Sequence, residues 1–369
     1  MIVVLNFIRK HKKSLNYTII SALVFSVILF SLAFFFKQGL YNGEIDGWFA
    51  HTLRMKEFLL GNVSWFEFFE EPNYQHAFTP GYHFLTALLD MLINNVYTTR
   101  VVFNIACFLL SNIFIIMICN ELKIDKNALF MTITMPILLL DAVGLVHSYS
   151  FILFAAIFYM YSTIRLIHHN KGIVLGIVSG TILFFSREIN WALFLFPIIY
   201  SISYSVKNHR EKLFFSRTWN TISSSILIPS VFYLSFLLLA DIAYLIPERI
   251  QTLHLWDSCR NVNAFLITAL LSYTTLPILI LIRLKKLTWN CFPLLLISGI
   301  MLISRLIAPG PFWPHYFETS IVPLSLVVFN TLNTSNKSRI FILITIGINV
   351  IISVVIYLDA SGFVSLMLC

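Results

Sequence analysis

The chain has 369 residues, of which 58% are hydrophobic and only 11% are charged, and its formal net charge is +8. Soluble domains contain about 25% charged residues, so this composition excludes an ordinary soluble protein and indicates a polytopic membrane protein. The excess of positive charge is explained by the orientation of the chain in a membrane, and we therefore expect no nucleic-acid partner.

Long apolar segments follow one another along the chain, most of them near the roughly 20 residues that cross a bilayer as a helix. They predict about eleven spans, near 15–36, 101–119, 128–146, 149–166, 173–186, 190–206, 219–240, 263–282, 291–307, 319–332 and 340–357. The predicted fold is an all-α transmembrane helical bundle that forms a single membrane domain over residues 1–369.

The apolar segment 80–94 is predicted not to cross the membrane. As a helix it would be only about 22 Å long, and it starts at Pro80 and contains Asp90. With this segment outside the membrane and the N-terminus inside, most Lys and Arg residues fall on the cytoplasmic side, as the positive-inside rule requires. Acidic residues then gather on the outer face. This asymmetry indicates either chemistry or cation binding there, or simply longer outer loops.

The first outer loop, 37–100, is long and rich in aromatic and acidic residues, which is typical of a functional loop. Within it, 47–60 has helical periodicity and predicts an amphipathic helix lying in the membrane interface. Asp46 stands at the expected start of this helix, close to Glu44. There Asp46 can act as a general base toward a hydroxyl group, or it can merely cap the helix.

His51, His76 and His83 lie on the same outer loop. Imidazoles and carboxylates together bind divalent cations, but these spacings match no standard ligand motif, so a divalent cation stays an open alternative. The loop leads into the apolar segment through the turn Thr79-Pro80-Gly81-Tyr82. Proline is ordinary in the first turn of a helix, so this turn alone does not indicate a function.

A second outer segment, between the fifth and sixth predicted spans, contains Arg187, Glu188, Asn190 and Trp191. Arg187 can pair with Glu188, or its planar guanidinium can bind a phosphate oxygen of a lipid-linked substrate. An Arg and an Asn at a helix break are costly to bury without a use, which favours phosphate binding. Trp191 is expected at the membrane interface under either interpretation.

A third outer segment, 305–318, has three prolines and a glycine that predict a rigid turn. Arg305 lies within the end of a predicted span, where a charged side chain extends to the interface or faces a polar cavity. His315 and Tyr316 follow the turn. They either bind a phosphate group or form part of an interfacial aromatic belt.

These segments resemble the GT-C membrane glycosyltransferases, and more narrowly the family of dolichyl-phosphate-glucose α-1,2-glucosyltransferases. That family has an Asp-Glu pair, a Thr-Pro-Pro-Gly-Leu-Tyr turn, an Arg-Gln-Thr-Asn-Ile-x-Trp motif and an Arg-Tyr pair near a late span. The present chain has similar segments in the same order, at Asp46, 79–82, 187–191 and 315–316. It departs from the family at Gly47, where the second acid of the pair is missing.

The resemblance implies a GT-C-like fold with juxtamembrane helices in the first outer loop, and a hexosyltransferase activity. A sugar would pass from a polyprenyl-phosphate donor to a hydroxyl of a lipid-linked glycan acceptor on the outer face of the membrane, with Asp46 as the base. Arg187 and Arg305 would hold the donor phosphate, and Glu44 and Glu188 would bind sugar hydroxyls. The other expected substrate contacts are His51, Thr79, Tyr82, Asn190, Trp191, His315 and Tyr316. Composition and compactness favour a bacterial inner membrane over the endoplasmic reticulum.

Two other functions fit a polytopic chain. An O-antigen-type polymerase would be expected to rely on large late periplasmic loops rich in Arg, whereas the largest outer loop here is the first. A flippase or transporter of lipid-linked oligosaccharides would place charges near mid-membrane and pairs of broken helices in two related halves. Here the charges lie mostly at span ends and no repeat is evident.

Overall fold

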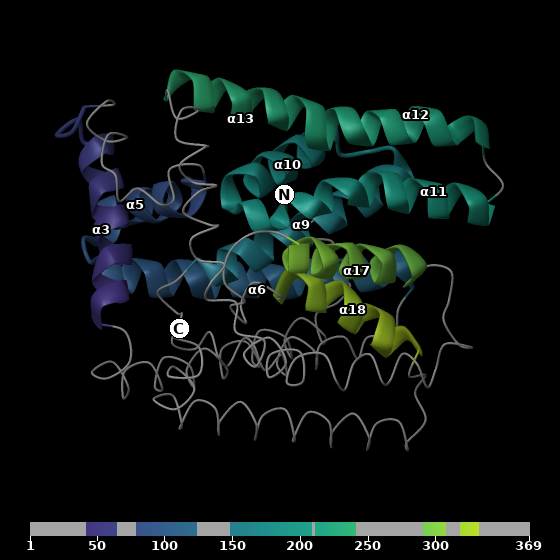
Figure 1. Cartoon of the computed structure of the whole chain (residues 1–369), viewed down its shortest axis with the longest axis horizontal. Helices are drawn as coiled ribbons and strands as arrows, with labels where there is room; N and C mark the ends of the chain where they lie inside the picture. Colours follow the sequence, from purple (N-terminus) through teal and green to yellow (C-terminus); the bar gives the residue numbers. More distant parts are fainter. Residues whose placement is uncertain are drawn as a thin grey trace, which may run out of the picture.

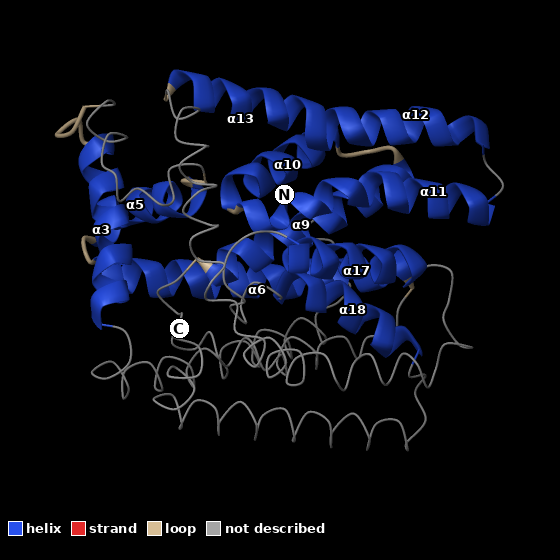
Figure 2. Ribbon diagram, viewed as in Figure 1, coloured by secondary structure: helices blue, strands red, loops and turns tan. Residues whose placement is uncertain are grey.

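The computed structural model describes residues 42–64, 79–123, 148–208, 211–240, 291–307 and 318–331. The regular secondary structure within these ranges is helical throughout, which confirms the predicted all-α class (Figure 2). In chain order the elements are α3 (Asn42–Leu59), α5 (Gly81–Ile93), α6 (Val96–Leu122), α9 (Tyr149–His169), α10 (Ile173–Ser186), the 3₁₀-helix η3 (Glu188–Leu195), α11 (Phe196–Asn208), α12 (Glu211–Ile222), the π-helix η4 (Ser223–Leu227), α13 (Ile228–Leu239), α17 (Phe292–Ile307) and α18 (Glu318–Thr331).

Three helical segments in the described part of the chain are long and apolar enough to cross a membrane: Val96–Leu122, Ser150–His169 and Phe215–Leu239. They correspond to three of the spans predicted from the sequence. Helices α10, α11, α17 and α18 also match predicted spans in position but have only 13 to 16 residues each. The predicted spans 15–36, 128–146, 263–282 and 340–357 lie outside the described residues. The described helices are therefore consistent with a membrane protein and include three candidate spans.

The first outer loop contains two helices. The predicted interfacial helix is α3, and it begins at Asn42 rather than near Asp46, so the interpretation of Asp46 as a helix cap is wrong. Helix α5 has only 13 residues, or about 20 Å, and that it lies outside the membrane stays a prediction. It ends at Asn94, whose φ of 54° is left-handed, a conformation that Asn tolerates better than most residues.

Helix α6 is longer than the predicted span 101–119 because its cap lies further upstream. Asn95 has extended backbone, and its side chain accepts a hydrogen bond from the backbone N–H of Thr98 at 2.9 Å. This is an N-cap interaction, which starts the helix at Val96. The extra turns carry Arg100 into the helix, where it becomes part of the site described below.

Helices α6 and α9 lie side by side and run in the same direction (Figure 1). At one end, the rings of Phe103 and Phe151 are 5.8 Å apart; at the other end, Glu121 lies 2.9 Å from His169. Helix α10 returns along α9, so its last residues lie at the same end as the start of α6. Helices α3 and α5 close that end of the bundle, which we call the α3 end.

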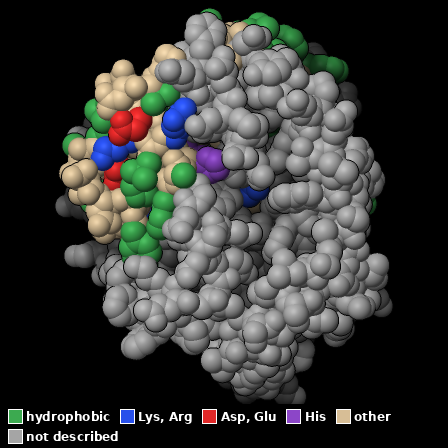
Figure 3. All heavy atoms as spheres, turned by 60° about the vertical axis from the view of Figure 1, so that its left-hand side comes forward, with side chains coloured by type: hydrophobic (Ala, Val, Ile, Leu, Met, Phe, Trp, Pro, Cys, Tyr) green, Lys and Arg blue, Asp and Glu red, His purple; other side chains and the backbone are tan. Residues whose placement is uncertain are grey.

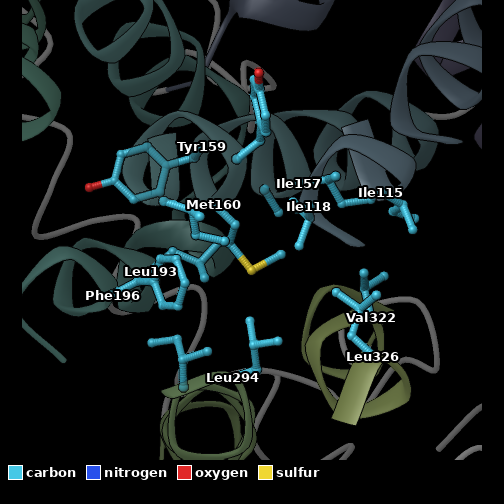
Figure 4. Close-up of a cluster of buried hydrophobic side chains, with 14 of the residues drawn as sticks. Ile115, Ile118, Ile157, Tyr159, Met160, Leu193, Phe196, Leu294, Val322 and Leu326 are labelled. Carbon is cyan, nitrogen blue, oxygen red and sulfur yellow. The ribbon is translucent and has the colours of Figure 1, made fainter. Parts of the chain in front are cut away.

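The core lies between α6, α9, η3, α17 and α18, with α9 at its centre (Figure 4). Its buried apolar side chains include Ile115, Ile118, Ile157, Tyr159, Met160, Leu193, Phe196, Leu294, Val322 and Leu326. Helix α13 is different, because Leu238 and Leu239 expose 74% and 75% of their surface. Helix α13 is the last part of the 25-residue helical segment Phe215–Leu239, and an exposed apolar face on such a segment is suited to contact with lipid.

Small residues allow α10 to approach the chain that precedes α13. A Cβ atom added to Gly180 would overlap the backbone carbonyl of Ser225 in the π-helix η4, and one added to Gly176 would lie 2.7 Å from the Ser224 hydroxyl. Small residues four apart are a common means of close helix packing in membranes. This contact fixes α10 beside the α12–η4–α13 helix and so positions the end of α10 at the α3 end.

Candidate functional site

Two of the segments singled out in the sequence meet at the α3 end. Gly81 begins α5, and a Cβ atom on it would lie only 2.6 Å from the carbonyl oxygen of Phe185 near the end of α10. Thr79 and Pro80, just before Gly81, are buried. The turn 79–82 therefore packs directly against the start of the segment 185–191, although about a hundred residues separate them in the sequence.

The segment 185–191 forms a break between two helices, as expected. Helix α10 ends at Ser186, Arg187 has extended backbone with φ −171° and ψ 147°, and the 3₁₀-helix η3 begins at Glu188. Arg187 is largely buried, with 7% of its surface exposed. A buried guanidinium at an interruption of the backbone is an arrangement that suits binding of an anionic group.

Asn190 is fully buried and stabilises the same break through hydrogen bonds. Its Nδ2 atom donates hydrogen bonds to the backbone carbonyl of Ile152 at 3.0 Å and to the Ser186 hydroxyl at 3.3 Å. Its Oδ1 atom has no hydrogen-bond partner among the described residues. Asn190 thus ties the break to α9 and keeps one buried acceptor available.

Trp191 lies at the surface of the same break, with 36% of its side chain exposed. Its ring packs edge-on against Tyr233 of α13 at a centroid distance of 5.7 Å and lies near Phe184 at 6.4 Å. A half-exposed Trp flanked by aromatic rings at the end of apolar helices fits the predicted position at a membrane interface.

Beside this break lies a buried polar cluster that the sequence reasoning missed. At its centre is Arg100 of α6, which is fully buried. Its Nε atom donates to the Thr52 hydroxyl at 3.0 Å, and its Nη2 atom lies 3.2 Å from His83 Nδ1. Because a guanidinium can only donate, Nδ1 of His83 is the acceptor in this bond. The guanidinium carbon also lies 5.5 Å from the ring centre of Phe49 and 5.2 Å from that of Tyr82.

Tyr82, predicted as a substrate contact, belongs to this cluster. Asn104 Nδ2 donates to its hydroxyl oxygen at 3.2 Å, and its ring packs against Phe103 and Phe151. Burial raises the pKa of Tyr82 to about 12, and the nearby charge of Arg100 lowers it only in part. Tyr82 is therefore neutral at physiological pH.

An ion pair joins the three helices at the outer edge of the cluster. Lys56 Nζ of α3 donates to Asp90 Oδ2 of α5 at 2.8 Å and to Asn94 Oδ1 at 3.0 Å. The Thr99 hydroxyl of α6 donates to Asp90 Oδ1 at 2.9 Å. Asp90 is almost completely buried, and these bonds give each of its carboxylate oxygens a protein donor. These bonds hold α3 rigidly across α5 and α6.

His51 also lies in this region, with its ring 5.4 Å from that of His83. The sequence left open whether these histidines bind a cation. The structure gives no support for this at His83, because its Nδ1 atom faces the positively charged guanidinium of Arg100. Within the described ranges, the α3 end has no group of three His, Cys, Asp or Glu side chains close enough to hold a metal ion. His76 lies outside the described residues.

The remaining predicted site residues are placed only in part. Asp46 and Glu44 lie in the first turns of α3, Glu188 begins η3 and Arg305 lies near the end of α17, but their side chains are outside the described part of the structure. His315 and Tyr316 lie outside the described residues altogether. The structure thus brings together His51, Thr79, Tyr82, Arg187, Asn190 and Trp191 at the α3 end.

The described surface at the α3 end carries acidic and basic side chains next to hydrophobic ones (Figure 3). No protein-family model matches the chain, and no curated protein matches it significantly. The fold and the site together define an all-helical protein with three candidate membrane spans and a charged and aromatic site at one end of its bundle. Such a site can bind an anionic group through arginine and can stack a flat or ring-shaped ligand on its aromatic side chains.

Proposed function

We propose that the protein is a GT-C-like membrane glycosyltransferase of about eleven spans. It would move a hexose from a polyprenyl-phosphate donor to a hydroxyl of a lipid-linked glycan acceptor on the outer face of a membrane, most consistently a bacterial inner membrane. The single observation that carries this proposal is the contact between Gly81 and Phe185. It joins two of the segments that resemble the glycosyltransferase motifs.

In this proposal Asp46 is the general base that removes a proton from the acceptor hydroxyl as it attacks the sugar. Its position in α3 supports the role, because Thr52 and Lys56 of the same helix are bonded to Arg100 and Asp90. A base must be held within a fraction of an ångström of its productive position, and a helix fixed at two points provides such a support.

Arg187 is proposed to bind the donor phosphate, which is the leaving group of the reaction. Negative charge develops on that phosphate in the transition state, and a fixed guanidinium stabilises it by several kcal/mol, of order ~3 for one well-placed donor. Arg305 would provide the second positive charge. Glu44, Glu188 and the free Oδ1 atom of Asn190 are proposed to accept hydrogen bonds from sugar hydroxyls, and a divalent cation near Asp46 stays an open part of the proposal.

The test is transfer of radiolabelled sugar from polyprenyl-phosphate donors by the purified protein in detergent, with membrane lipid extracts as the source of acceptor. We expect the wild type to transfer label and Asp46→Asn to lose about 100-fold or more in rate, the magnitude for removal of a general base. Arg187→Lys should lose activity as well, because lysine cannot make a bidentate bond to phosphate.

Glu57→Gln is the matched control for Asp46→Asn. Glu57 lies in the same helix and accepts a hydrogen bond from Asn62 at 2.6 Å at the surface, so removing its charge should leave transfer unchanged. Activity in Asp46→Asn equal to that of the control would reject Asp46 as the base. Absence of transfer by the wild type with every donor would reject the glycosyltransferase itself and favour a transporter or polymerase.

A further inference from the structure

A carboxylate and two imidazoles converge at the end of the bundle opposite the α3 end. Glu121 lies in the last turn of α6, and His168 and His169 are the last two residues of α9. One potential ligand atom from each lies within 4.8 Å of the other two. We propose that these three side chains bind a divalent transition-metal ion of the Zn²⁺ class.

The spacing of the three atoms suits a shared ion. His169 Nε2 lies 2.9 Å from Glu121 Oε2, and His168 Nδ1 lies 3.5 Å from the same oxygen. Metal–ligand bonds of about 2.1 Å at angles between 90° and 109° separate two ligand atoms by roughly 3.0 to 3.4 Å. An ion can therefore be placed among the three side chains with small rotations, and water would complete its coordination.

The surroundings of His168 are compatible with the form that a metal requires. The Tyr200 hydroxyl of α11 lies 2.7 Å from Nε2 of His168. With Nε2–H donating to this oxygen, the lone pair of Nδ1 is directed to the side of Glu121. Metal-bound histidines regularly use their second nitrogen in this way, and such a partner orients the ring and raises its basicity.

The backbone next to the histidines is also fixed. Arg217 of α12 donates to the carbonyl oxygens of Ile167 and His168 at 2.8 and 2.9 Å, which satisfies carbonyls at the C-terminus of α9. The negative end of the helix dipole lies there and favours a bound cation. Arg165 Nη1, at 3.6 Å from Glu121 Oε1, is the one competing cation at the carboxylate among the described ion pairs.

The proposed metal site is separate from the proposed glycosyltransferase site and does not depend on it. Arg100 and Glu121 are at opposite ends of α6, about 30 Å apart along the helix axis. In the orientation predicted from the sequence, the cluster faces the cytoplasm. An ion there would join the C-terminal ends of α6 and α9 and, through Tyr200, α11. Its role would be to stabilise the packing of these three helices.

The competing explanation is an ion-pair cluster in which protonated histidines neutralise Glu121 without a metal. The test is Zn²⁺ binding to the full-length protein in detergent after removal of metals with a chelator, measured by titration calorimetry and by metal analysis. We expect one Zn²⁺ per chain, and we expect Co²⁺ in its place to give visible absorption bands typical of nitrogen and oxygen ligands.

His169→Gln is the most informative variant, because His169 is half exposed and its replacement should not impair folding. We expect His169→Gln and Glu121→Gln each to weaken Zn²⁺ binding at least 100-fold, and Tyr200→Phe to weaken it about 10-fold as a partner of a ligand. Glu57→Gln, which removes an exposed carboxylate in α3 at the other end of the bundle, is the control and should leave binding unchanged. Substoichiometric binding by the wild type, or binding that His169→Gln leaves unchanged, would overturn the proposal.

Discussion

Gly81 and Phe185 are in direct backbone contact, although they belong to different helices. The first residue of α5 faces the carbonyl oxygen of Phe185 so closely that an added Cβ atom would lie 2.6 Å from it. Contact with a backbone atom cannot be relieved by rotating a side chain. The start of α5 and the break after α10 are therefore fixed relative to each other, and with them Tyr82 and Arg187.

Gly81→Ala should consequently destabilise the protein. The added methyl group must push α5 away from α10, and overpacking of this kind costs about 1–3 kcal/mol. Thermal unfolding in detergent measures the change. Gly299→Ala is the matched control, because nothing lies within 4 Å of a Cβ atom at Gly299 in the middle of α17. Equal stability of the two variants would contradict the close contact at Gly81.

Arg100→Lys should destabilise the protein even though the charge is kept. Lysine cannot reproduce the bonds from two guanidinium nitrogens to Thr52 and His83, nor the stacking on the rings of Phe49 and Tyr82. We expect a loss of about 2–4 kcal/mol in the free energy of unfolding.

Arg165→Lys provides the comparison for Arg100→Lys. Arg165 donates to the hydroxyl of Tyr161 at 3.1 Å, but unlike Arg100 it is partly exposed. Its replacement should cost less than about 1 kcal/mol. If Arg100→Lys were as stable as Arg165→Lys, the buried polar cluster would not be a structural centre of the α3 end.

The sequence was sufficient for features that depend on local composition and spacing. The apolar runs predicted the all-α class, and the short segment with Pro80 and Asp90 predicted a short helix, as found in α5. The polar residues between the apolar segments 173–186 and 190–206 predicted the break between α10 and η3. In each case the decisive residues lie within one or two helical turns of one another.

Features that depend on contacts between distant segments could not be predicted in this way. Arg100 was assigned to a loop, because nothing local showed that Thr52 and His83 would surround it. A charged residue within an apolar stretch was the one available signal. Likewise, nothing local indicates that Glu121 meets His169, since this contact follows from the parallel packing of α6 and α9.

The ion pair between Lys56 and Asp90 should couple strongly in a double-mutant cycle. Lys56→Met leaves a carboxylate that is almost completely buried, with Thr99 as its one remaining side-chain donor in the described part of the chain, whereas Asp90→Asn leaves a lysine that can turn toward water. Lys56→Met should therefore cost more, about 3 kcal/mol, and the coupling energy should be about 1–3 kcal/mol.

The surface pair of Glu57 and Asn62 is the reference for this cycle. Its 2.6 Å hydrogen bond is exposed to solvent, so its coupling energy should not exceed about 0.5 kcal/mol. Free energies of unfolding of the single and double variants give both values. A coupling between Lys56 and Asp90 no larger than that of the reference pair would show that the ion pair does not hold α3 in place.

The phenol of Tyr82 should make the protein sensitive to alkaline pH. Its pKa is raised by burial from 10.0 in the unfolded chain to about 12 in the fold. The folded state holds this proton more tightly than the unfolded chain does. The resulting contribution to the free energy of unfolding is therefore fully present below pH 10 and is lost as the pH rises from 10 to 12. By linkage, a pKa difference of two units between the folded and unfolded states corresponds to about 3 kcal/mol in the free energy of unfolding.

Tyr82→Phe isolates this effect, because the ring over Arg100 is kept and only the titrating hydroxyl and its bond from Asn104 are removed. Stability of the wild type and of Tyr82→Phe is compared between pH 8 and pH 12. The variant should be less stable by about 1 kcal/mol at pH 8, where the hydrogen bond is lost. Because the variant has no phenol to ionise at this position, the difference should shrink or reverse as the pH approaches 12. A constant difference across this range would mean that water reaches the Tyr82 hydroxyl in the folded protein.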